Sequence, residues 1–153
     1  MEIQPDFKEL LVLLNAHGVD YLIVGGYALA FHGAPRFTGD LDVFISTTPA
    51  NAGKVYSALN AFGFESVGLT PEDFSRADQV IQLGVPPVRI DFVTTIDGVE
   101  WTAAWAGRDQ GEYGGVPVCF LGKPEFIKNK KATGRLKDLA DVEALQGGDE
   151  AGD

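Results

Sequence analysis

The sequence has only one cysteine, Cys119, so no disulfide bond can form within the chain and nothing indicates an oxidising compartment. It also lacks any apolar run close to the ~20 residues that a membrane-spanning helix needs. Its first residues, Met-Glu-Ile-Gln-Pro-Asp, carry no basic cluster of the kind that opens a secretory signal. We therefore expect a cytoplasmic protein without a membrane partner.

Basic residues are also scarce: twelve Lys and Arg oppose twenty-two Asp and Glu, for a formal net charge of −10. If these charges were evenly spread, they would repel a polynucleotide and exclude broad, sequence-independent nucleic-acid binding. The distribution is uneven, however, because half of the basic residues lie in a basic segment, residues 123–137, beside the single acid Glu125. The local charge of this segment is therefore more informative about partners than the average.

The composition is otherwise that of a globular protein. Apolar residues make up 45% of the 153 positions and charged residues 22%. A chain of this length can bury roughly two-thirds of its unfolded surface, which is enough for a hydrophobic core. The last seven residues are rich in glycine and acids. We expect one domain over residues 1–146 and a flexible acidic tail over residues 147–153.

The hydrophobic pattern predicts helices and strands in mixed order with short connections. Thr48-Pro49, for example, is an N-cap followed by proline at the first helical position, and Gly63 ends the helix. The other expected helices cover 7–17, 27–32, a short piece after Pro71, 100–106, and a pair from 124 to about 145 with a break at Thr133-Gly134. The expected strands cover 21–24, 40–45, 80–83, 88–94, 112–113 and 116–121. This order indicates a single α/β (α+β) domain in which helices flank a small mixed β-sheet.

Gly25-Gly26 stands between an expected strand and an expected helix. Glycines at such a junction let the backbone approach a ligand closely, and the N–H groups of the helix that follows can bind phosphate. A tight turn that needs a positive φ explains the same pair without any ligand. Taken alone, the pair favours the tight turn.

Asp40 and Asp42 lie two residues apart on an expected strand, so both carboxylates leave the same face. Their separation would be roughly 6–7 Å by strand rise, and at an effective dielectric of 20 the two charges would repel by about 2.5 kcal/mol. A solvated strand edge would relieve this repulsion, and so would a divalent cation. Because Asp is disfavoured in strands, we favour the cation.

A third carboxylate, Asp91, interrupts the apolar strand Val-Arg-Ile-Asp-Phe-Val. If this strand lies beside the one that carries Asp40 and Asp42, the three acids converge and could hold two Mg²⁺ ions, the arrangement used for in-line phosphoryl or nucleotidyl displacement. Arg89, on the same face as Asp91, could instead pair with it as a salt bridge; we favour the metal site. The three carboxylates alone would equally suit phosphodiester hydrolysis.

Together these residues resemble the signature of the DNA polymerase β-like nucleotidyltransferase superfamily. The resemblance rests on Val24-Gly25-Gly26, the Asp40-Leu41-Asp42-Val43 run that follows thirteen residues later, and Asp91 on a later strand. The stretch Gly-Gly-Tyr-Ala-Leu-Ala-Phe-His-Gly, followed by Arg36-Phe37-Thr38-Gly39-Asp40, resembles more specifically the minimal bacterial nucleotidyltransferases, which include the AbiEii-type toxins of type IV toxin–antitoxin systems. The basic stretch 128–139 also resembles that group, so the similarity covers roughly residues 10–145.

The resemblance implies a nucleotidyltransferase fold and a reaction. Asp40 and Asp42 would ligate two Mg²⁺ ions, with Mn²⁺ as an alternative. Asp91 would ligate the catalytic metal and is a candidate to take the proton from the attacking hydroxyl. Gly25 and Gly26 would cradle the β- and γ-phosphates of a nucleoside triphosphate such as ATP. Attack on the α-phosphorus would transfer a nucleoside monophosphate to an RNA, protein or small-molecule hydroxyl and release pyrophosphate; a cognate antitoxin would be a further partner.

The basic segment supplies candidate triphosphate ligands. Lys128, Lys131 and Arg135 would share one helical face if the helix continued through Gly134. A solvated helix face is the usual fate of such a run, but with a triphosphate expected nearby we select Lys131 and Arg135. Arg36 and the hydroxyl of Thr38, both in the loop before Asp40, are further candidates for phosphate contacts.

Two other functions fit parts of the pattern. A catalytically weak nucleotidyltransferase-like protein could act as a binding module, such as one half of a toxin–antitoxin pair. An Asp-x-Asp glycosyltransferase would bind a nucleotide sugar through a metal, but it would leave the upstream Gly-Gly unexplained and the chain is short for that class. All three carboxylates are present, so we favour an active nucleotidyltransferase.

Overall fold

The structure is a computed structural model that describes residues 3–34, 39–64, 68–85 and 87–152, with side chains described as far as residue 146. In these ranges six strands form one mixed sheet in the order β3-β4-β2-β1-β6-β5. Neighbours β1–β2, β3–β4 and β5–β6 are antiparallel, whereas β1–β6 and β2–β4 are parallel. The strands are β1 (Tyr21–Val24), β2 (Asp40–Ile45), β3 (Val80–Val85), β4 (Val88–Val93), β5 (Asp109–Tyr113) and β6 (Val116–Phe120).

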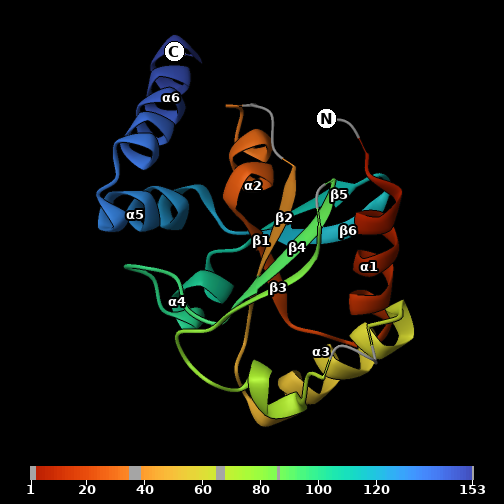
Figure 1. Ribbon diagram of the computed structural model, residues 1–153. Helices are drawn as coiled ribbons and strands as arrows, with labels where there is room; N and C mark the ends of the chain where they lie inside the picture. The colour runs from red at the N-terminus through yellow and green to blue at the C-terminus, as the bar shows by residue number, and fades with distance from the viewer. Residues whose placement is uncertain (1–2, 35–38, 65–67, 86, 153) are drawn as a thin grey trace.

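Helices flank the sheet, with α1 and α3 on one side and α4 and α5 on the other (Figure 1). Their bounds are α1 (Pro5–Ala16), α2 (Gly25–Phe31), α3 (Pro49–Phe62), the 3₁₀ turn η1 (Pro71–Phe74), α4 (Trp101–Ala106), α5 (Lys123–Thr133) and α6 (Leu136–Gly152). The predicted single α/β domain with a small mixed sheet and flanking helices is therefore confirmed. None of the described helices is long and apolar enough to cross a membrane.

Local signals explain both ends of α3 and the end of α5. Thr48 accepts a hydrogen bond from the backbone N–H of Asn51 at 3.3 Å and so caps α3. The helix ends at Gly63, whose φ of 113° lies in the left-handed region that glycine tolerates. The same logic ends α5, because Gly134 has a φ of 69°, and the break that the sequence predicts there is observed.

The core lies between the sheet and the helices. Phe7, Leu10, Leu11 and Leu14 recur at helical spacing and are all buried in α1. On β2, Leu41 and residues 43–45 are buried, whereas Asp40 and Asp42 are half-buried. The sheet therefore presents acids on one face without exposing its apolar face.

Several boundaries differ from the sequence prediction. β3 and β5 are longer than expected, since pairing with β4 and β6 extends each strand into polar or glycine-containing positions. The helix expected after Pro71 is a single 3₁₀ turn. The backbone of α6 continues to Gly152, past the start of the expected tail at residue 147; the division into domain and tail stays a prediction.

Candidate active site

Three aspartates lie on one face of two adjacent strands. β2 and β4 pair in parallel with Asp42 directly opposite Asp91, and Asp40 opposite Arg89. The strand neighbourhood on which the sequence argument depended is thus present. Residues paired across adjacent strands project from the same face, so these four ionisable side chains share one patch of the sheet.

Burial and mutual repulsion perturb this patch. Asp91 is buried, with 7% of its surface exposed. Burial, and to a lesser extent the neighbouring carboxylates of Asp91 and Asp40, raise the pKa of Asp42 from 3.8 to about 6, while Lys130 and Arg89 oppose the shift. A nearby cation would stabilise the ionised form of this carboxylate. Perturbed pKa values of this kind cluster at functional sites.

Arg89 binds the acids directly. Its Nε and Nη2 atoms donate to Oδ1 and Oδ2 of Asp91 at 3.1 and 3.0 Å, and Nε lies 3.9 Å from Oδ2 of Asp40. The hydrogen bonds with Asp91 raise the pKa of Arg89 above its usual range. The salt bridge that we set aside in favour of the metal site is therefore present: two residues apart on one strand, the side chains share a face, and the guanidinium fork matches the carboxylate.

The start of α2 lies against the same patch. Gly25 has a φ of 68°, and a Cβ added there would overlap the carboxylate of Asp42. Gly26, the next residue, is buried. The Gly-Gly pair therefore does more than make a turn, because it lets the backbone lie directly against one of the acids.

One lysine of α5, which is not among the predicted ligands, lies close to the acids. Lys130 is near enough to Asp42 to lower the pKa of that carboxyl, and its side chain is only 12% exposed. Its Nζ lies 5.3 Å from the ring centroid of Phe126, which is buried. The four-residue spacing from a buried phenylalanine was the available signal that Lys130 faces the protein.

Lys130 forms an ion pair with Asp138 of α6, at 3.3 Å between Nζ and Oδ1. Asp138 is fully buried and accepts hydrogen bonds from Oγ1 of Thr133 and Nε of Arg135, both at 2.6 Å. Burial would raise the pKa of Asp138, but these hydrogen bonds and the charge of Lys130 outweigh it and lower the pKa to about 2. The carboxylate is therefore a fixed negative charge that positions three side chains.

The predicted phosphate ligands are placed unequally. Lys131 is exposed, and Arg135, with 69% of its side chain exposed, is paired with Asp138. The helix does not continue through Gly134, so the shared face from Lys128 to Arg135 is interrupted. Arg36 and Thr38 lie outside the described residues. The roles of these four side chains in binding phosphate stay predictions.

The chemistry of the donors fits a divalent cation. Asp40, Asp42 and Asp91 offer hard carboxylate oxygens, the ligands that Mg²⁺ takes, and burial together with their mutual repulsion raises the pKa of Asp42. In the part of the chain that the structure describes, however, no three His, Cys, Asp or Glu side chains are grouped so that they could hold an ion. The two-metal site therefore stays a prediction.

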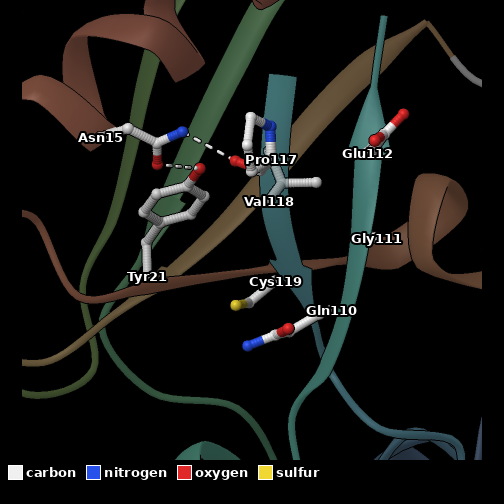
Figure 2. Close-up of a pocket in the computed structure, with 8 residues that line it drawn as sticks. All are labelled: Asn15, Tyr21, Gln110, Gly111, Glu112, Pro117, Val118 and Cys119. Atoms are coloured by element: carbon white, nitrogen blue, oxygen red, sulfur yellow. Dashed lines mark hydrogen bonds between the residues drawn. The ribbon is translucent and has the colours of Figure 1, made fainter. Parts of the chain in front are cut away.

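A hollow of about 500 Å³ lies elsewhere, over β5, β6 and the start of β1. Figure 2 shows Asn15, Tyr21, Gln110, Pro117 and Cys119 among its lining residues. Asn15 donates to the carbonyl oxygen of Pro117 at 2.7 Å and accepts from the hydroxyl of Tyr21 at 2.9 Å. Burial raises the pKa of Tyr21. These polar groups bind one another, and none of the predicted site residues lines this hollow.

Comparison with known proteins supports the fold. No family model and no curated protein matches the sequence. Among solved structures, the crystal structure of a "putative nucleotidyltransferase" from Thermotoga maritima is similar, with a TM-score of 0.57 and 14% sequence identity. The similarity covers 95% of this chain and 94% of that chain. At this level of identity it shows a shared fold over nearly the full length.

Proposed function

We propose that the protein is a nucleotidyltransferase that transfers a nucleoside monophosphate from a nucleoside triphosphate to a hydroxyl acceptor and releases pyrophosphate. The observation that carries the proposal is the pairing of Asp42 with Asp91 across two parallel strands, with Asp40 on the same face. The fold shared with the Thermotoga protein gives independent support. ATP is one candidate donor.

The acids have distinct roles in this proposal. Asp40, Asp42 and Asp91 would hold two Mg²⁺ ions, for which Mn²⁺ could substitute. These ions supply positive charge that offsets the negative charge developing on the triphosphate. Asp91 also accepts the proton of the attacking hydroxyl, for which a carboxylate beside the reacting atoms is suited.

Backbone and basic groups would bind the triphosphate. The backbone of Gly25 lies against the carboxylate of Asp42, and the N–H groups of Gly25 and Gly26 would bind the phosphates there. We add Lys130 to the predicted ligands, because it is the α5 lysine whose charge acts on Asp42. Lys131, Arg135, Arg36 and Thr38 remain proposed contacts, either to the phosphates or to an acceptor that approaches the basic segment.

The acceptor would meet a mostly acidic surface. An RNA would be confined to the basic segment, because the rest of the chain carries the excess of negative charge. A protein or small-molecule hydroxyl has no such restriction. The finer assignment, that the protein is an AbiEii-type toxin with a cognate antitoxin, also belongs to the proposal and rests on the sequence resemblance.

A second candidate function is a catalytically weak nucleotidyltransferase-like binding module, for example one partner of a toxin–antitoxin pair. The observation that favours it is the bidentate pair between Arg89 and Asp91, which engages both oxygens of the proposed proton acceptor. An active enzyme must break this pair, whereas a binding module can keep it.

In the test, the protein is incubated with nucleoside triphosphates, Mg²⁺ and RNA, protein or small-molecule acceptors. The rate is measured from the release of pyrophosphate. Asp42→Ala and Asp91→Ala should each lower the rate ~10³-fold or more, the several kcal/mol that metal charge stabilisation supplies. Asp6→Ala, which removes an exposed acid of α1, is the matched control and should not change the rate. Thermal stabilisation by Mg²⁺ and nucleotide without turnover would favour the binding module.

A further inference from the structure

The guanidinium of Arg89 contacts the same carboxylates that are proposed to hold the metal. It donates to both oxygens of Asp91, at 3.1 and 3.0 Å. It also lies 3.9 Å from Oδ2 of Asp40 on the neighbouring strand. One side chain thus engages two of the three proposed ligands at once.

Arg89 can leave this position more easily than the acids can follow it. Its side chain is 32% exposed, whereas that of Asp91 is 10% exposed. A long arginine stem can change rotamer and carry its charged group into water. The carboxylate of Asp91 is on a short side chain of a strand that pairs with both β2 and β3, so it stays close to the sheet.

Two cations that bind the same oxygens repel each other at short range. Mg²⁺ binds carboxylate oxygens at about 2.0–2.1 Å, so a guanidinium hydrogen-bonded to the same oxygens would lie within a few ångströms of a doubly charged ion. We propose that Arg89 and a divalent cation compete for the oxygens of Asp91 and Asp40, so that binding of the cation releases the guanidinium. This inference rests on the metal site of the proposed function.

Competition predicts a sign that a structural role does not. If Arg89 occupies the oxygens that the cation needs, its removal must tighten cation binding. If Arg89 only orients Asp91, its removal must loosen a ligand and weaken cation binding. In the first case Arg89 sets the cation concentration at which the site fills.

The test is Mn²⁺ binding without nucleotide, measured from the loss of the electron paramagnetic resonance signal of the free ion. We expect Arg89→Met to tighten binding about tenfold, the scale of releasing hydrogen bonds between charged groups. Arg89→Lys keeps the charge but loses the planar fork, so its Mn²⁺ affinity should lie between those of wild type and Arg89→Met. The control is Arg76→Met, because Arg76 also pairs with an acid, Asp73 at 3.9 Å, and its removal changes the net charge equally.

The outcomes separate the inference from the proposed function. Unchanged or weaker Mn²⁺ binding by Arg89→Met overturns the competition, and so does equal tightening by Arg76→Met. The proposed metal site is still supported in that case if Asp42→Asn abolishes Mn²⁺ binding. Absence of Asp42-dependent binding in both wild type and Arg89→Met overturns both. If Arg89→Met does not fold, the wild type is tested instead. Saturating Mg²⁺ must shift the side-chain Nε–H resonance of Arg89 and speed its hydrogen exchange. An unchanged resonance contradicts the competition between Arg89 and the cation.

Discussion

The backbone of Gly25 lies so close to the carboxylate of Asp42 that a Cβ at position 25 would overlap it. Gly25 begins α2 and Asp42 lies in β2, so this contact fixes the start of a helix against an acid of the neighbouring strand. Because β2 also pairs with β4, the same contact relates α2 to Asp91 through the sheet. The glycine is thus part of the geometry of the acid patch.

Gly25→Ala should therefore disturb the acid patch as well as the backbone. A left-handed φ costs an alanine roughly 1 kcal/mol, and the overlap with Asp42 adds to this loss. Gly18→Ala is the matched control, because Gly18 has the same φ of 68° and nothing lies within 4 Å of an added Cβ. Chemical denaturation and Mn²⁺ titration of both variants are the measurements. We expect both to lose stability and only Gly25→Ala to lose Mn²⁺ affinity; equal affinities would contradict a role for this contact.

Asp42→Asn should stabilise the protein at neutral pH in the absence of metal. The native pKa of about 6 lies above the ordinary 3.8, so the native state binds the proton more tightly and stability falls as the pH rises from about 4 to 6. The loss amounts to about 2–3 kcal/mol at pH 7, and a neutral asparagine avoids it. Urea denaturation of wild type and variant at pH 4, 5, 6 and 7 tests this, and a difference that does not grow with pH would contradict it.

Much of this fold could be predicted from the sequence, because its strands and helix ends depend on short-range signals. β1 and β2 have the predicted bounds, and α3 has the predicted cap and stop. The extra length of β5 could not be predicted, since Asp109, Gln110 and Gly111 have no strand pattern of their own. They are strand only because β6 pairs with them.

The candidate site shows the same division. The shared face of Asp40 and Asp42 follows from strand periodicity, and their approach to Asp91 depends on a pairing that the sequence only allows. Which lysine of α5 faces the acids depends on how Phe126 docks in the core, so the spacing alone did not single out Lys130. The bidentate contact of Arg89 was foreseeable as an alternative, but its geometry required coordinates.

Asp138→Asn should destabilise the protein, since it weakens the hydrogen bonds and charge pairs that join α5 to α6. We expect a loss of about 2 kcal/mol at pH 7, the scale of a hydrogen bond to a charged group. The lowered pKa of about 2 means that this contribution is present above pH 4 and is lost as the pH falls toward 2. Glu143→Gln, an exposed acid on the same helix, is the control. Denaturation at pH 7 and pH 3 gives the free energy of unfolding of both variants. Equal losses of stability in Asp138→Asn and Glu143→Gln would contradict a stabilising role for the buried carboxylate of Asp138.

Lys130→Met should weaken nucleotide binding more than Lys131→Met. Lys130 acts electrostatically on Asp42, whereas Lys131 is exposed. We expect the KM for the triphosphate to rise about tenfold or more in Lys130→Met, the scale of one charge-assisted contact, and to change little in Lys131→Met. Steady-state kinetics with both variants gives the comparison. A larger effect at Lys131 would instead support the ligand selected from the sequence.

If the paired aspartates of β2 and β4 catalyse nucleotidyl transfer, the two ends of the triphosphate must have different fates. Wild-type protein and Asp42→Asn are incubated with Mg²⁺, the acceptor pools and nucleoside triphosphates labelled on either the α- or the γ-phosphate. We predict that wild type transfers the α-label to an acceptor and releases the γ-label as pyrophosphate, and that Asp42→Asn does neither. Release of the γ-label as inorganic phosphate, or equal α-labelling by wild type and Asp42→Asn, would rule out nucleotidyl transfer by these aspartates.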